Sequence, residues 1–228
     1  MSDTYDKTDP RIGRIEEKFA RRYGPKAAKT PKDDEDEKAY LSRKIRTIVK
    51  VDRSSQATET DYHAAIQSFG VAMAKDSQIG FQTYECEDIN AGDIMKRLSD
   101  EPNGWVHFIK VTDPAASRLY VPCRLDAVSV SAVCNVLWSY PQVLRFKIVG
   151  YGNATHRADV IVAWFAHAYH ALAMGAILEN LYSDHLMGDR PVGSYRCTMK
   201  GMCGWAPEVG SSVGMDIRRD ILAKFGLA

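Results

Sequence analysis

Residues 144–165 read LRFKIVGYGNATHRADVIVAWF and contain two runs of β-branched and aromatic residues around a short polar connection. Such runs predict two neighbouring strands. Lys147 stands between Phe146 and Ile148. Because side chains alternate across a strand, Lys147 is expected on the opposite face from both. A cation beside a buried strand is costly unless water or an anion meets it. Two interpretations follow: Lys147 faces water, or Lys147 and Arg157 face a cleft that receives an anion such as a phosphate.

The sequence on either side of this stretch alternates expected strands with expected helices. Strands are expected at residues 46–52 and 104–113, and helices at residues 62–75, 91–98, 125–140, 166–182 and from about Gly214. Asp61 and Asp126 are expected to cap two of these helices. The β-α-β-β-α order in the centre predicts an α+β fold, with helices packed on a mostly antiparallel sheet.

The N-terminal part differs in composition from the rest of the chain. Residues 10–24 predict a short helix, because Ile12, Ile15, Phe19 and Tyr23 share one side of it. Residues 25–38, PKAAKTPKDDEDEK, mix both charges with two prolines and predict a linker that is either solvated or a docking arm. We therefore expect a flexible, charged extension over residues 1–38 and a single α+β domain over residues 39–228.

Composition excludes several classes of protein. A formal net charge of +1 argues against general nucleic-acid binding. The five cysteines form no CxxC pair, so neither a disulfide framework nor a zinc site is indicated. The start, MSDTYDKTDPRIGR, has no apolar core of a signal peptide, and we expect a cytoplasmic protein. Residues 159–178 have the length of a membrane helix but contain Asp159, His167 and His170, so a strand followed by a helix is expected, with no membrane partner.

Histidines and cations supply the candidate site residues. His107, in WVHFIKV, can line a cleft or be a hydrogen-bonded core residue, and Lys110, three residues on, is expected on the opposite face. Lys147 and Arg157 flank the short connection and can lie close together, although an ion pair between Arg157 and Asp159 is the simpler alternative.

Further cations follow in the C-terminal third. Arg196 and Lys200 lie in a Gly-rich stretch whose backbone N–H groups can approach a phosphate, and Arg218 is placed near the start of the last helix. His167 and His170 lack a third ligand at metal-binding spacing, so no metal is predicted. A group of cations with an imidazole suits a doubly charged phosphate.

Two stretches resemble one bacterial family. They are RFKIVGYGNATHRADVIVAWF at residues 145–165 and MCGWAPEVGSSVGMDIRRDIL at residues 202–222. The family includes Hop-type type III secretion effectors of plant pathogens and actinobacterial relatives, some of which are lyases that make class V lanthipeptides and thioamitides. The resemblance covers roughly residues 104–222, since GWVHFIKV is similar to the family's opening strand.

The resemblance implies a phosphothreonine-lyase-like fold and reaction. A partner kinase would phosphorylate Ser or Thr in a precursor peptide, and the lyase would remove the Cα proton and expel phosphate without a metal or organic cofactor. Lys147 would be the base, and either His107 or Lys110 would protonate or neutralise the leaving oxygen. The expected phosphate ligands are Arg157, Arg196, Lys200 and Arg218.

One departure keeps other functions open. Trp105 stands where the lyases usually carry a second cation, two residues before the histidine. A non-catalytic phosphopeptide-binding or leader-binding partner of the same fold is therefore one alternative. A secreted effector that acts on host phosphoproteins is another.

Overall fold

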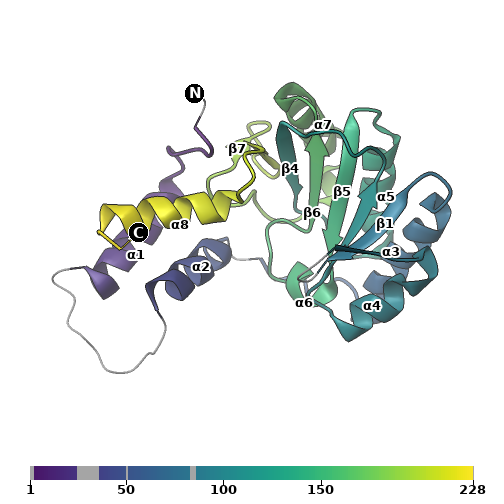
Figure 1. Cartoon of the computed structure of the whole chain (residues 1–228), viewed down its shortest axis with the longest axis horizontal. Coiled ribbons are helices and arrows are strands. Elements are labelled where there is room, and N and C mark those ends of the chain that lie inside the picture. Colours follow the sequence, from purple (N-terminus) through teal and green to yellow (C-terminus); the bar gives the residue numbers. More distant parts are fainter. Residues whose placement is uncertain (1–2, 25–35, 50, 83–85, 228) are drawn as a thin grey trace.

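The computed structural model describes residues 3–24, 36–49, 51–82 and 86–227. It has the expected α+β fold, built on an eight-stranded sheet in which every neighbouring pair of strands is antiparallel (Figure 1). The strand order is β2-β1-β3-β5-β6-β4-β8-β7. The strands are β1 (Gln78–Gln82), β2 (Cys86–Asp88), β3 (Trp105–Ile109), β4 (Ser117–Val121), β5 (Val143–Val149), β6 (Ile161–Phe165), β7 (Tyr195–Arg196) and β8 (Gly204–Pro207).

Helices lie on both faces of this sheet. The α-helices are α1 (Pro10–Tyr23), α2 (Glu37–Thr47), α3 (Glu59–Met73), α4 (Ile94–Asp100), α5 (Ala127–Ser139), α6 (Tyr151–Ala154), α7 (Ala168–Leu181) and α8 (Val213–Lys224), and the 3-10 turns are η1 (Ala91–Asp93) and η2 (Ser183–His185). Helices α3, α4, α5 and α7 cover one face. Helices α1, α2 and α8 gather at the other side of the molecule (Figure 1).

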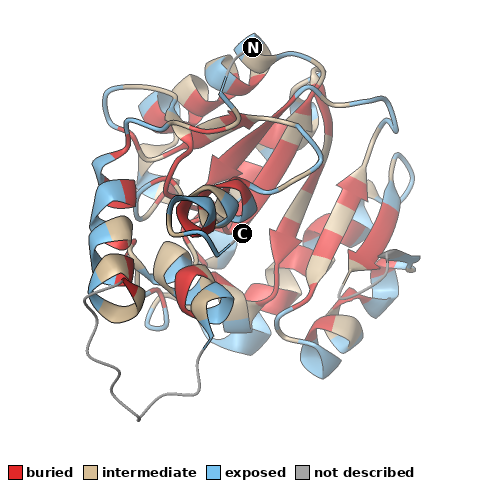
Figure 2. Ribbon diagram, turned by 60° about the vertical axis from the view of Figure 1, so that its left-hand side comes forward, coloured by how far each residue is buried: buried red, intermediate tan, exposed pale blue. Residues whose placement is uncertain are grey.

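The main core lies between the sheet and α3, α4, α5 and α7. Val106 and Phe108 of β3 and Phe146 and Ile148 of β5 are fully buried there. Burial of each such side chain contributes about 1.5–3 kcal/mol. Buried residues follow the strands and the inner sides of the helices in Figure 2. The alternation expected for residues 144–149 is therefore confirmed, and Lys147 projects from the opposite face.

A second, smaller core lies on that opposite face. Ile15 of α1, Leu41 of α2 and Ile217 of α8 are fully buried in it, together with Tyr120 of β4 and Val162 of β6. The partly buried Trp105 and Trp164 pack at its edge. This layer therefore covers the β6-β4-β8 part of the sheet and stops at the strands that carry Trp105, His107 and Lys147.

Two sequence expectations about strands are wrong. The described residues of the range 46–52 form no strand: α2 runs to Thr47, and no strand is assigned to residues 48, 49, 51 and 52. Leu41, Ile45 and Val49 recur every four residues, which is the period of a helix face. The strand β6 begins at Ile161, so Arg157 and Asp159 lie in the loop between α6 and β6.

The N-terminal helix is confirmed at residues 10–23, with Ile12, Ile15 and Phe19 buried. Asp9 caps it and accepts hydrogen bonds from Arg11, which is itself buried. The described part of the expected flexible extension is thus packed against the domain. Most of the linker, residues 25–35, lies outside the described residues, and the domain boundary at residue 38 stays a prediction.

The stretch at residues 159–178 is a strand followed by a helix, as expected, because it contains β6 and most of α7. Within the described ranges, no helix combines the length and apolar character needed to cross a membrane.

Candidate functional site

The pairing of β3 with β5 places His107 directly opposite Lys147. Side chains of such partners project from the same face, with Cβ atoms about 4.5–5.5 Å apart. Trp105 lies two residues before His107 and therefore shares this face, which α3, α5 and α7 do not cover. Two of the three residues expected to carry acid–base chemistry, His107 and Lys147, thus lie side by side at the edge of the second core.

Trp105 contacts two cations, Lys147 and Arg157. The Nζ atom of Lys147 lies 4.3 Å from the centre of the indole, and the guanidinium carbon of Arg157 lies 5.1 Å from the same centre. A cation over an indole face is stabilised by about 0.5–2 kcal/mol. Lys147 also lies 5.6 Å from the ring of Trp164, and Arg145 lies 5.5 Å from it. Trp105 and Trp164 therefore contact three cations, Arg145, Lys147 and Arg157, on the face of the sheet opposite the main core.

Arg157 also pairs with Asp159, so the simpler interpretation of this pair is confirmed. Its Nε and Nη2 atoms donate to the two carboxylate oxygens of Asp159 at 3.0 and 2.8 Å. Burial alone would lower the pKa of Arg157, but Asp159 raises it above its ordinary value. This two-point contact through Nε and Nη2 fixes the plane of the guanidinium.

His107 is held in its neutral form. Its Nε2 atom lies 2.8 Å from Oε1 of Gln82 on β1. Burial lowers the pKa of His107 to about 4, and the positive charges of Lys147 and Arg145 add to this effect. At pH 7 the imidazole therefore carries no charge, and it cannot act as an imidazolium acid in the free protein.

The neutral state of His107 predicts a pH effect on stability. Because its pKa falls on folding from the ordinary value near 6.5, the unfolded chain binds more protons between about pH 4 and 6.5. The free energy of unfolding should therefore fall as the pH is lowered through this window. In the His107→Gln variant, urea unfolding at pH 5 and pH 7.5 should show a smaller difference. An unchanged difference would contradict the assignment, since His63, whose pKa is also lowered by burial, is present in both proteins.

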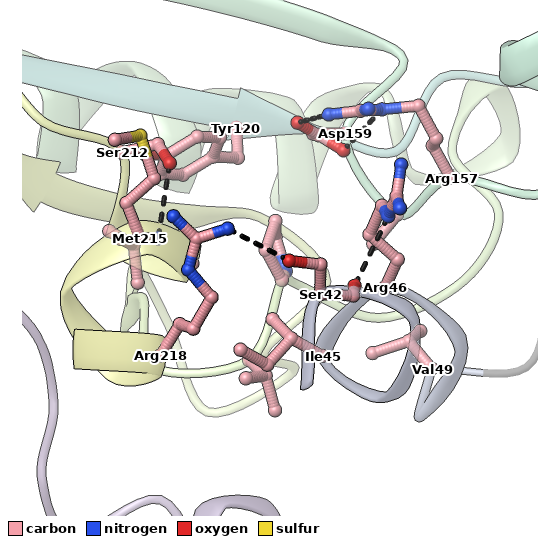
Figure 3. Close-up of a pocket in the computed structure, with 15 residues that line it drawn as sticks. Ser42, Ile45, Arg46, Val49, Tyr120, Arg157, Asp159, Ser212, Met215 and Arg218 are labelled. Carbon is pink, nitrogen blue, oxygen red and sulfur yellow. Dashed lines mark hydrogen bonds and ion pairs between the residues drawn. The ribbon is translucent and has the colours of Figure 1, made fainter. Parts of the chain in front are cut away.

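A cavity of about 370 Å³ lies beside this cluster, between α2, the loop with Arg157 and the start of α8. Figure 3 shows the side chains of Arg46, Arg157 and Arg218 around Ser42. Nη1 of Arg218 donates to Oγ of Ser42 at 3.0 Å, and Nε of Arg46 donates to the Ser42 carbonyl at 3.1 Å. The described lining of the cavity thus contains three guanidinium groups and one carboxylate, that of Asp159.

The N-terminus of α8 opens into the same cavity. Ser212 is its N-cap and accepts from the backbone N–H of Met215 at 3.2 Å, and both line the cavity with Val213 and Gly214. The first turn of a helix leaves backbone N–H groups unpaired and carries a partial positive charge. Guanidinium groups and a helix N-terminus that face one cavity favour an anionic ligand, above all a phosphate.

Of the predicted site residues, Arg157 and Arg218 belong to the described lining of this cavity, whereas His107, Lys110, Lys147, Arg196 and Lys200 do not. Lys110 donates to the carbonyls of Trp138 and Tyr140 at 2.8 and 3.0 Å, at the C-terminal end of α5. It thus lies on the face opposite His107, as the spacing predicted. Lys200 donates to the carbonyl of Glu179 in α7 at 2.7 Å.

Arg196 and Arg218 have different positions. Arg196 lies on β7, four strands from Lys147, which is roughly 19 Å at the usual strand spacing. Arg218 reaches the cavity that Arg157 also lines. Sequence reasoning does not identify Arg46, because it predicts a strand over residues 46–52, and no motif marks Ser42. The four-residue spacing of Leu41, Ile45 and Val49 was the available indication of a helix.

Comparison with known proteins finds solved structures with a similar fold but does not assign the chain to a family. No family model matches the sequence, and no curated protein matches it. An effector protein from Pseudomonas syringae pv. tomato strain DC3000 has a similar structure, with a TM-score of 0.71 and 11% sequence identity over 98% of this chain and 88% of that one.

A second effector protein, from Pseudomonas syringae pv. syringae strain 61, has a TM-score of 0.61 and 12% identity over 96% of this chain and 95% of that one. The similarity extends beyond residues 104–222 to nearly the whole chain. At these identities it establishes an effector-like fold.

Proposed function

We propose that the protein eliminates phosphate from phosphoserine or phosphothreonine in a peptide and leaves a dehydroamino acid. Lys147, as the neutral amine, takes the Cα proton. The C–H electron pair forms the Cα=Cβ bond, and the Cβ–O bond breaks with its electrons on the phosphate. The Lys147 ammonium then passes this proton, directly or through a water molecule, to the leaving group, which becomes hydrogen phosphate, and the amine is regenerated.

One observation carries this proposal: Lys147 and Arg157 lie 4.3 and 5.1 Å from the centre of the same Trp105 indole, and Arg157 also lines the cavity. In a phosphorylated residue the Cα and phosphorus atoms lie roughly 4 Å apart, so a base and a phosphate ligand must be neighbours. Lys147 Nζ and the Arg157 guanidinium contact the same indole and so lie near each other, which supports the proposal.

The cavity suits the leaving group. A phosphate monoester carries about −1.5 to −2 charges at pH 7, and Arg157, Arg218 and Arg46 supply donors for its oxygens. Charge that develops on the leaving phosphate is stabilised there. His107 is neutral in the free protein, and a bound dianion would raise its pKa toward the range in which it can donate a proton.

A second candidate function is phosphopeptide binding without turnover. The indole of Trp105, 4.3 Å from Lys147 Nζ, favours the ammonium, whereas a base must be the neutral amine. Under this alternative the same cavity would hold the phosphate of a modified peptide, and a partner kinase would supply that modification in both cases. The effector-like fold also fits a secreted protein that acts on phosphoproteins of another cell. Turnover of a host phosphoprotein, as opposed to a precursor peptide, would distinguish this role from peptide biosynthesis.

Phosphate release from a phosphothreonine peptide tests the proposal. The wild-type protein should release inorganic phosphate and leave a product that adds a thiol. Arg218→Met removes a charged donor from the cavity and should weaken phosphopeptide affinity by about 10–100-fold, since a hydrogen bond to a charged group contributes about 1.5–3 kcal/mol. Arg219→Met, at the next and exposed position of α8, is the matched control. Equal affinity of both variants would mean that the cavity does not bind the phosphate. Binding without phosphate release would support the second candidate.

A further inference from the structure

Arg53 is fully buried next to the loop that carries Arg157, between α2 and α3 in the chain. Its Nη1 atom donates to the carbonyls of Arg157 and Ala154 at 2.6 and 3.2 Å, and Nη2 donates to the carbonyl of Met187. Its backbone N–H donates to the carbonyl of Thr155 at 3.1 Å. These contacts join the segment at residues 154–157 to the segment that follows residue 186.

This guanidinium forms no ion pair within the described residues. Its Nε atom also lacks a hydrogen-bond partner there. Burial lowers the pKa of Arg53 to about 10, so it remains charged at pH 7. A buried charge without a counter-ion costs several kcal/mol, and an apolar side chain of similar volume would fill the space at lower cost. The arrangement is therefore hard to explain as a means of stabilising the fold.

The contacts of Arg53 lie in two segments that each contribute residues to the lining of the cavity. The carbonyl that it binds on Arg157 belongs to the residue whose guanidinium reaches both the cavity and Trp105. On the other side, Met187 leads to Pro191 and Val192, which also line the cavity. A single rigid, planar donor group thus ties together the backbone of two separate lining segments.

Gly188 lies next to the contact between Arg53 and the Met187 carbonyl. Its φ of +110° is unfavourable for residues with a side chain, and a Cβ atom there would lie 3.2 Å from Nη2 of Arg53 and 3.0 Å from Val51. A side chain at this position would therefore press on the guanidinium and on Val51.

We propose that Arg53 is a positioning residue: it fixes the backbone of Arg157 relative to residues 187–192 and so sets the shape of the phosphate cavity. The expected effect of Arg53 on phosphopeptide binding rests on the proposed function. Its effect on the backbone of the two segments is independent of that function. Lysine at this position would keep the charge, but one ammonium cannot span both segments in the way that a guanidinium does.

Amide hydrogen exchange tests the structural part without any ligand. In Arg53→Lys, amides at residues 151–158, 187–190 and 192 should exchange at least about tenfold faster than the change in global stability accounts for. Amides of β3 and β5 should follow global stability alone. Gly188→Ala, which disturbs the same contact while Arg53 is kept, should give the same local pattern. Uniform acceleration in the variants that fold, or no acceleration at residues 151–158, would overturn the proposal.

A double-mutant cycle tests the functional part, with binding of a phosphothreonine peptide measured in the Lys147→Met background to prevent turnover. Arg53→Lys should lower the affinity by about tenfold when Arg157 is present and by less than about twofold in Arg157→Ala. Equal losses in both backgrounds would overturn the positioning role. If the protein with intact Arg53 and Arg157 binds no phosphopeptide, the proposed function fails, and the exchange pattern still decides whether Arg53 fixes the loop.

Discussion

Replacing Lys147 with methionine should lower the rate of phosphate elimination by about 10²–10⁴-fold, which is the usual contribution of a positioned general base. Methionine preserves much of the length and packing of the side chain between Trp105 and Trp164 but has no group that accepts the Cα proton. Phosphopeptide affinity should change far less, because Arg157 and Arg218 remain in the cavity. Steady-state phosphate release and equilibrium binding, measured on the same peptide, check both parts.

Lys110→Met is the matched control for this variant. Lys110 lies one residue beyond β3 and binds carbonyls at the end of α5, on the other face of the sheet. Its loss should lower stability slightly and leave the elimination rate of the folded protein unchanged. If Lys110→Met abolished elimination while Lys147→Met retained it, the assignment of the base would be wrong.

Replacing Asp9 with alanine should lower the free energy of unfolding by about 3–5 kcal/mol, the cost of removing one partner from a buried ion pair. Asp9 is buried and lies 2.7 and 2.8 Å from the guanidinium groups of Arg11 and Arg190, which are buried as well. Its Oδ2 also accepts from the N–H of Gly193 at 3.0 Å. Without this carboxylate, two buried guanidinium groups lose a shared counter-ion. Urea or thermal unfolding measures the loss.

The pH dependence of this contribution has a definite sign. Burial alone would raise the pKa of Asp9, but hydrogen bonds from Arg11, Gly193 and Arg190 hold it well below its usual value. The contribution is therefore complete above the unfolded pKa, near 3.9, and is lost as the pH falls below it.

Two variants separate the causes of this loss. Asp9→Asn keeps the cap of α1 but lacks the charge, so it should recover only the smaller share that belongs to the cap. Asp3→Ala breaks an exposed ion pair with Lys7 and should leave stability unchanged. Equal stability of Asp9→Ala and Asp3→Ala would contradict the burial of this network.

Much of the central sheet could be predicted because its residues alternate. Phe146 and Ile148 on one side of β5 and Lys147 on the other indicate a strand with one buried face. The strand β4 (SRLYV) shows no alternation, since both of its faces are covered, and β7 has two residues. The burial of Asp9 could not be predicted either, because its partner Arg190 lies 181 residues further along the chain.

The candidate site divides in the same way. Lys147 could be predicted because strand alternation separates it from Phe146 and Ile148, and Arg157 because its connection is short. The position of His107 opposite Lys147 depends on the register of β3 with β5, which the sequence does not show. Arg46 and Arg53 could not, since each gains its position from contacts with distant segments. The cavity itself depends on α2 and α8 meeting beside the sheet, and local sequence does not encode that contact.

Mass spectrometry of a phosphothreonine peptide incubated with the wild-type protein tests the central claim most directly. Elimination predicts a product lighter by about 98 Da, the mass of phosphoric acid, whereas hydrolysis by a phosphatase would remove about 80 Da. We expect the loss of about 98 Da with the wild type and its near absence with Lys147→Met. An unchanged peptide mass, or a loss of 80 Da, would contradict it.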